Sequence, residues 1–227
     1  MGVIKASTLF DKDLNSLWDQ HPTMTTDEYT ALAATINNNS TYSNDEKNLL
    51  KGLLPNATPT EIRLAARILS TFGSIYPQRS NERAKHHTKA AKLFEQAANH
   101  KNITPNEILI AAYELGVLGY KYPERSDERT NYHDRAAGLY EQFANRHGAT
   151  PREIQLTSLK LRNLGFSHPE GSEERTNYHD KAAKLIEQTA NHKDAKTHHI
   201  FPATYELKAL GSKYSDRASE LFKKLGF

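Results

Sequence analysis

The feature that most constrains the fold of this chain is an internal repeat with a period of 46 residues. The heptapeptide ERTNYHD occurs at Glu128 and again at Glu174, and glycines mark the same spacing. These glycines are Gly73, Gly119, Gly165 and Gly211. A repeat of this length is one supersecondary unit that buries its apolar face only against stacked neighbours, so the sequence predicts an array of such units.

Each of the first three units begins with the signals of a helix start. Thr58, Thr104 and Thr150 are each followed by Pro and, three residues on, by Glu. The Thr hydroxyl can cap the amide of that Glu, the Glu can bond back to the Thr, and Pro suits the first helical position. In the first unit, apolar residues then recur with helical spacing from Ile62 to Tyr76, which predicts one buried face.

A second helix is predicted in the same units. Pro77 and Pro123 end the first helix, because the residue before a proline disfavours the helical region. Ser80, Ser126 and Ser172 then supply N-caps, with acidic residues in the first turn that suit the helix dipole. Each second helix is expected to run for about 20 residues, or roughly 30 Å, and no segment has the pattern of a strand.

The expected organisation is all-α. Residues 1–56 should form an N-terminal cap helix at Leu9–Trp18 and an entry hairpin, and residues 57–227 should form one continuous domain that ends in a helix at Ser215–Leu225. The four units of that domain are expected at 57–102, 103–148, 149–195 and, in shortened form, 196–227.

The units resemble the tetratricopeptide repeat family. In the first unit the resemblance rests on Leu69, Phe72, Gly73, Tyr76, Ala90, Phe94 and Ala97. The units depart from the family in length, since its repeats have about 34 residues, and in having Leu at the place of its first large aromatic residue. The resemblance implies a right-handed α-solenoid of stacked antiparallel hairpins. It also implies a concave side, lined by the first helices, that binds an extended peptide or another protein's helix.

Composition excludes several classes of site. The 227 residues include no Cys, so this chain can form no disulfide, no thiolate metal site and no Cys nucleophile. The net charge is only +3, and basic and acidic residues are interleaved, which argues against nucleic acid as the partner.

No secretory signal or membrane-spanning run is recognisable. We expect a cytoplasmic protein. The alternative is export to a host cell without a cleaved signal, because the tail SELFKKLGF looks like those of bacterial effectors.

A recurring Arg and His on the second helix form the first candidate set. The pairs are Arg83 with His87, Arg129 with His133, and Arg175 with His179. They fall on the apolar stripe, so we interpret them as a structural ladder that satisfies carbonyls at the turn, with Arg129 stacked on Tyr122. The alternative is that the Arg residues clamp acidic groups.

Catalysis and metal binding fit this set less well. It is repeated, and no activated nucleophile with its base accompanies it. Equivalent His residues in helix layers about 8–10 Å apart cannot converge on one zinc ion. We therefore expect no enzyme activity, no cofactor and no metal.

The second candidate set lies where the units differ from one another. On the side of the first helices opposite the buried stripe, aromatic residues alternate with cations, as is typical of interfaces. The predicted partner-binding residues are Arg67, Tyr113, Tyr120, Leu159, Arg162, Phe166, Tyr205 and Lys208.

These residues predict a scaffold or adaptor that binds a peptide or helix with acidic and apolar residues. Three alternatives stay open at this point. The aromatics are covered within the fold or by a second copy, the array binds RNA through base stacking, or it carries a hydrolase or transferase site.

Overall fold

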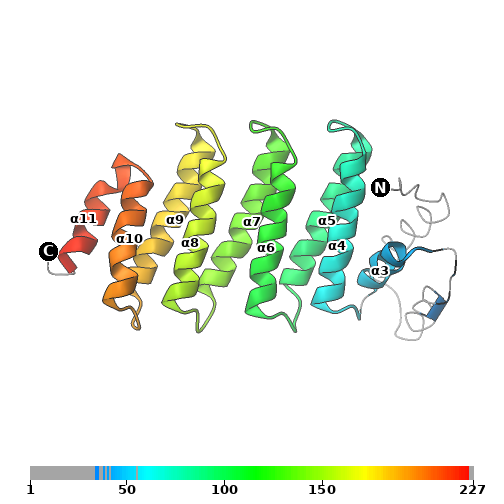
Figure 1. The fold of residues 1–227 in the computed structure, drawn as a ribbon, viewed down its shortest axis with the longest axis horizontal. Coiled ribbons are helices and arrows are strands. Elements are labelled where there is room, and N and C mark those ends of the chain that lie inside the picture. The colour runs from blue at the N-terminus through cyan, green and yellow to red at the C-terminus, as the bar shows by residue number, and fades with distance from the viewer. Residues whose placement is uncertain (1–33, 36–37, 39, 41, 55, 225–227) are drawn as a thin grey trace. The chain divides into compact units, whose positions relative to one another are not determined.

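The computed structural model describes residues 34–35, 38, 40, 42–54 and 56–224. Within these residues every regular element is a helix and none is a strand, which confirms the all-α class (Figure 1). The expected cap helix Leu9–Trp18 and the first half of the entry hairpin lie outside the described residues. Over the part of the chain that is described, no helix has the length and apolar character needed to cross a membrane.

The chain divides into two compact units, Met1–Glu107 and Ile108–Phe227. In the first unit the described helices are α3 (Asn44–Gly52), α4 (Pro59–Ile75) and α5 (Asn81–Ala98). α3 packs against α4, and α4 packs against α5. The expected boundaries of the repeats, and the single continuous domain of residues 57–227, stay predictions.

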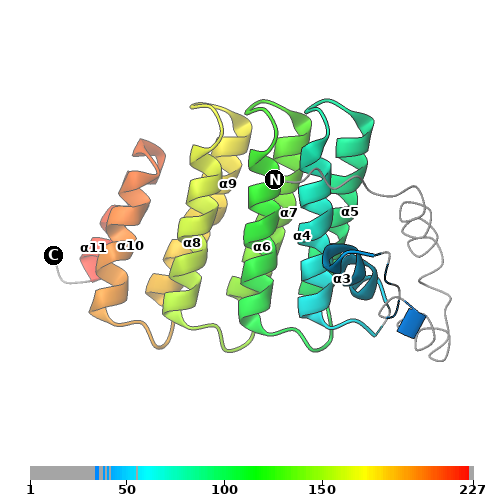
Figure 2. The same cartoon turned by 45° about the vertical axis from the view of Figure 1, so that its right-hand side comes forward.

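The second unit has the same pairwise packing. α6 (Pro105–Tyr120) begins at the end of the first unit and continues into the second. The other elements are α7 (Asp127–Asn145), α8 (Pro151–Phe166), α9 (Glu173–Asn191), α10 (Thr197–Ala209), a 3-10 turn (Ser212–Tyr214) and α11 (Ser215–Lys224). Consecutive helices from α7 to α11 contact one another, and Figures 1 and 2 show α8 beside α9 and α10 beside α11.

The helix starts are made by the residues that the sequence predicted. Thr58 and Thr150 form capping boxes with the Glu three residues on, and the amide of Thr104 donates to its Glu at 2.9 Å. The second helices begin at serine caps whose hydroxyl oxygens accept backbone amides at 3.1–3.2 Å. These caps are Ser80, Ser126 and Ser172.

A contact between glycine and histidine explains three of the four regularly spaced glycines. His133 is fully buried, and its Cδ2 would lie 2.3 Å from a Cβ placed on Gly119. The same distance holds for His87 at Gly73 and for His179 at Gly165. Only a residue without a side chain lets the imidazole approach the first helix so closely. Gly211 has no such neighbour; its φ of +125° lets the chain turn after α10.

Candidate functional site

The ladder residues of the first unit satisfy backbone oxygens near the end of α4. Arg83 Nη1 donates to the carbonyl oxygen of Tyr76 at 3.3 Å. His87 Nε2 lies 3.2 Å from the carbonyl oxygen of Ser70. Both contacts tie α5 to the last turns of α4, as a structural role would require.

Arg129 has a different aromatic partner from the one expected. Its guanidinium carbon lies 5.2 Å from the ring centroid of Tyr120, and its Nη2 donates to the carbonyl oxygen of Ser167 at 2.9 Å. Tyr122 is buried and packs on Tyr132 instead, with ring centroids 5.5 Å apart. The reason is that Tyr120 stands in the last turn of α6, whereas Tyr122 follows the helix and turns into the core. Arg129 therefore belongs both to the ladder and to the predicted partner surface.

The next repeat brings the two candidate sets together in the same way. The guanidinium carbon of Arg175 lies 5.0 Å from the ring centroid of Phe166. Phe166 packs edge-on against His179 with centroids 4.8 Å apart, and Tyr120 packs against His133 at the same distance. We call the combined surface of the second unit the cation–aromatic face. It comprises Tyr113, Tyr120, Arg129, Leu159, Arg162, Phe166, Arg175, Tyr205 and Lys208.

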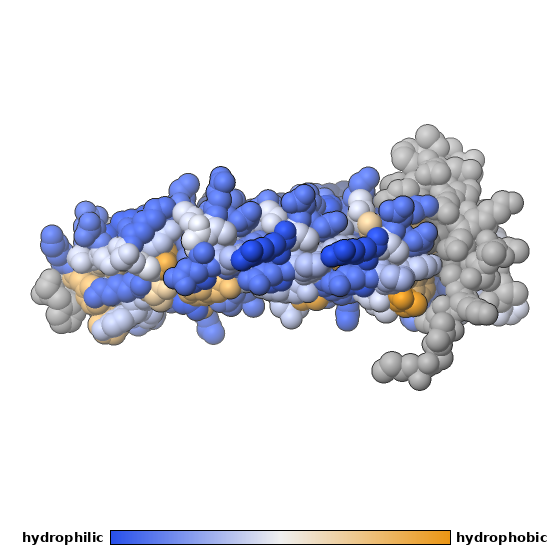
Figure 3. Space-filling view, turned by 90° about the horizontal axis from the view of Figure 1, so that it is seen from above, coloured by the Kyte–Doolittle hydropathy of each residue, from blue (hydrophilic) through white to orange (hydrophobic). Residues whose placement is uncertain are grey.

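The aromatic residues of this face are accessible. Tyr113, Tyr120, Phe166 and Tyr205 are between 45% and 53% exposed. Leu159, Arg162 and both ladder arginines are half-buried, and Lys208 is exposed. Seen from above in the left-hand part of Figure 3, hydrophobic side chains gather along the lower edge, which the helices at the front of Figure 1 form. The remaining predicted residue, Arg67, is exposed on α4 in the other unit.

A second aromatic cluster, at α10 and α11, was only partly anticipated. Tyr205 lies 5.1 Å from Phe201 and 5.6 Å from Phe222 between ring centroids, and Lys208 Nζ lies 4.7 Å from the Phe222 centroid. Sequence reasoning missed both Phe residues. The spacing of four residues between Phe201 and Tyr205 on one helix was the available signal.

A buried histidine pair lies behind Tyr120. His133 Nδ1 is 3.0 Å from His168 Nε2, and both residues are almost fully buried. Burial, together with the nearby His168 and Arg129, lowers the pKa of His133 to about 3. Burial and Arg129 also lower the pKa of His168. At neutral pH both rings are therefore uncharged, and one donates a hydrogen bond to the other.

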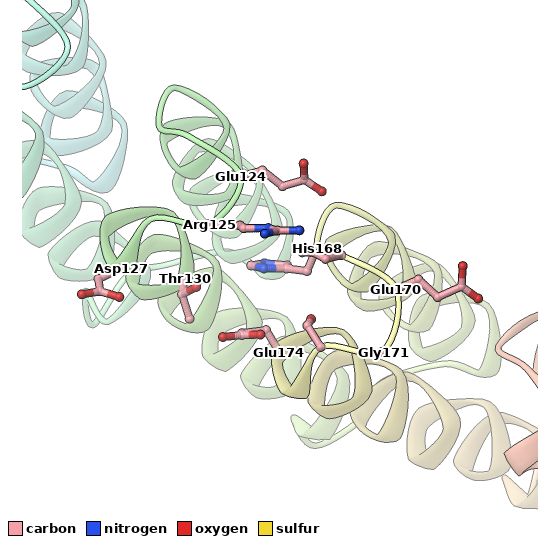
Figure 4. A pocket seen from close by; sticks show the side chains of 10 residues that line it. Glu124, Arg125, Asp127, Thr130, His168, Glu170, Gly171 and Glu174 are labelled. Carbon is pink, nitrogen blue, oxygen red and sulfur yellow. The ribbon is translucent and has the colours of Figure 1, made fainter.

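A polar pocket of about 430 Å³ lies between the turns that follow α6 and α8 (Figure 4). In Figure 4 the side chains of Arg125 and His168 extend from these two turns toward the same space, whereas the carboxylates of Asp127 and Glu170 point to either side. In the described part of the chain no three His, Asp or Glu side chains are grouped as metal ligands. The pocket therefore offers a mixed polar lining without a convergent set of groups.

No known family model, curated protein or solved structure matches this chain. The tetratricopeptide resemblance is thus a similarity of residue pattern and of helical repeats. Function has to be argued from the cation–aromatic face itself.

Arg129→Ala is expected to lower the free energy of unfolding by about 1–3 kcal/mol, because it removes the charged hydrogen bond to Ser167 and the contact with Tyr120. Urea denaturation followed by circular dichroism measures the change. Arg125→Ala, at an exposed turn position, is the control and should stay within about 0.5 kcal/mol of the wild type. Equal stability of the two variants would contradict a structural role for Arg129.

Proposed function

We propose that this protein is a non-enzymatic scaffold that binds a peptide or helix of a partner protein. The observation that carries the proposal is the cation–aromatic face, where the half-exposed rings of Tyr120 and Phe166 lie beside Arg side chains. Tyr, Phe and Arg are enriched at the centres of protein interfaces, and a few such residues carry most of the binding energy.

The proposal includes the architecture that the resemblance implies. In a right-handed solenoid of stacked antiparallel hairpins, the first helices of the repeats line the concave side. The pairwise packing of consecutive helices and the recurrence of the glycine–histidine contact support such an array. The cation–aromatic face, most of whose residues belong to α6, α8 and α10, would then lie on that concave side.

The chemistry of the buried histidines favours binding over catalysis. His133 and His168 are buried, uncharged and bonded to each other. Ser172, whose hydroxyl lines the polar pocket beside them, is used as the N-cap of α9 and accepts the amide of Arg175. A scaffold that stays in the cytoplasm and one exported to a host cell would use the same face.

The proposal predicts that Tyr120→Ala combined with Phe166→Ala weakens partner binding at least tenfold, since each anchor of an interface is worth about 2 kcal/mol. Wild-type and variant proteins are immobilised, and proteins retained from a nuclease-treated lysate are quantified by mass spectrometry. The retained partner is then purified, and its affinity for both proteins is measured.

Two controls keep this experiment decisive. Ile75→Ala removes an apolar side chain that is 55% exposed on α4, a helix that contributes no residue to the face, and should retain the partner. Tyr113→Ala removes a ring that is 53% exposed and should weaken binding without disturbing the buried histidines. Undiminished binding by folded Tyr113→Ala and by the double variant would refute the proposal. Binding lost on nuclease treatment, with a steep salt dependence, would favour an RNA-binding repeat instead.

A further inference from the structure

Phe166 is flanked by two guanidinium groups from different helices. The guanidinium carbon of Arg162, on α8, lies 5.9 Å from the ring centroid, and that of Arg175, on α9, lies 5.0 Å from it. The ring itself is 45% exposed. Two positive charges are therefore held beside one accessible apolar surface.

Neither guanidinium has a hydrogen-bond or ion-pair partner within the described residues. No ion pair or side-chain hydrogen bond joins Arg162 or Arg175 to any of them, and Arg162 Nε is buried without an acceptor. Four other cations of the second unit are paired with carboxylates. These pairs are Arg146 with Glu153, Lys181 with Glu141, Lys213 with Asp180, and Arg217 with Glu187.

The charges of Arg162 and Arg175 also act on His179, the buried imidazole that packs against Phe166. Burial lowers the pKa of His179, and the charges of Arg175 and Arg162 both lower it further. Both guanidinium carbons lie within 5.9 Å of the Phe166 centroid and neither is paired with a carboxylate, so an anion beside the ring would stabilise both charges. The arrangement is thus complementary to a negatively charged group.

We propose that Arg162 and Arg175, over the ring of Phe166, form a binding site for an Asp or Glu carboxylate of a partner peptide. This inference rests on the proposed function and names the chemistry of the partner. A guanidinium presents a planar fork that matches a carboxylate with two parallel hydrogen bonds. The exposed part of the Phe166 ring receives an apolar side chain next to the acidic residue.

A carboxylate fits this site better than a phosphate. Glu173 and Glu174 stand in the first turn of α9, close in sequence to Arg175, and repel a dianion more strongly than a monoanion. Phosphate sites commonly use the free amides of a helix start. At the start of α9, the Ser172 hydroxyl already accepts the amide of Arg175.

The equivalent positions in other repeats lack this arrangement. Arg162 corresponds to Gly116 in the preceding repeat, where Arg129 alone faces Tyr120 and donates to the Ser167 carbonyl. The site is therefore a property of one repeat, as expected for recognition rather than for repeat stability.

The test uses the full chain and two acetylated, amidated hexapeptides, Ser-Glu-Phe-Glu-Leu-Ser and the same peptide with Gln for both Glu. Binding is measured by calorimetry and by chemical-shift changes of the Phe166 ring. We expect the Glu peptide to bind at least tenfold more tightly than the Gln peptide. Arg162→Gln combined with Arg175→Gln should abolish this difference.

The matched control is Arg125→Gln combined with Arg152→Gln, which removes the same charge at two exposed positions. On α8, Arg152 lies about 20 Å from Phe166 by the helical rise. This variant should keep most of the preference for the Glu peptide. A preference lost equally in both variants would mean that net charge, not the site, selects the peptide.

Other outcomes would also overturn the site. These are equal binding of the two peptides, no binding of the Glu peptide at millimolar concentration, or stronger binding when phosphoserine replaces Glu. At low salt, Arg162→Gln should melt no lower than the wild type, because it removes the repulsion between Arg162 and Arg175. A marked drop in Tm with a retained preference for the Glu peptide would show that Arg162 has a structural role instead. The proposed function fails separately, if the purified partner binds folded Tyr113→Ala and the Tyr120→Ala, Phe166→Ala double variant as tightly as it binds the wild type.

Discussion

Gly119→Ala is expected to lower the free energy of unfolding by about 3 kcal/mol, at the upper end of the cost of overpacking a core. The added Cβ would lie 2.3 Å from His133 Cδ2 and 2.6 Å from its Nε2, so either the imidazole or α6 has to move. His133 has no room to yield, since it is fully buried and bonded to His168. Urea denaturation followed by circular dichroism measures the loss.

Gly138→Ala is the matched control, because Gly138 is exposed within α7 and a Cβ there meets nothing within 4 Å. It should raise the free energy of unfolding by about 0.5–1 kcal/mol through helix propensity. In a His133→Ala background, Gly119→Ala should cost far less than in the wild type, which a double-mutant cycle reveals. If Gly119→Ala and Gly138→Ala changed the free energy of unfolding in the same direction, the steric explanation of the regularly spaced glycines would be wrong.

Local signals allowed the helices to be predicted from the sequence. Capping boxes, serine N-caps and prolines act within four residues of one another, so Thr150 or Ser172 specifies a helix start without knowledge of the fold. The regular spacing of the glycines could be read from the sequence. The structural reason for that spacing could not, because it depends on how closely His133 approaches α6 from another helix.

The details of the candidate site depended on tertiary packing. The sequence predicted that Arg129 stacks on Tyr122, but in the structure Arg129 lies over the ring of Tyr120, in the last turn of α6. The His133–His168 contact joins residues of different repeats and arises because His168 stands where the first two repeats have Tyr. The sequence also shows charges but not their pairing, so the unpaired state of Arg162 became apparent only in the structure.

Acidification from pH 7 to pH 5 is expected to lower the free energy of unfolding by about 2 kcal/mol through His133 alone. Burial, with help from His168 and Arg129, lowers the pKa of His133 from its ordinary 6.5 to about 3. Between these values the unfolded chain binds a proton that the folded protein does not. The stability contributed by the neutral ring is therefore complete above pH 6.5 and is lost as the pH falls toward 3. Burial lowers the pKa of His168 and His179 as well, so they act in the same direction.

This effect can be separated from the titration of carboxylates. The backbone amide of Thr104 lowers the pKa of Glu107 below its ordinary 4.5, so that carboxylate loses its contribution only at lower pH. Urea midpoints measured between pH 5 and 7 therefore report mainly on histidine. His133→Gln should be less stable than the wild type at pH 7 but should show a slope smaller by up to one proton, about 1.4 kcal/mol per pH unit. If His133→Gln keeps the wild-type slope, the His133 ring binds its proton equally well in the folded and unfolded states, and the lowered pKa inferred from its burial is wrong.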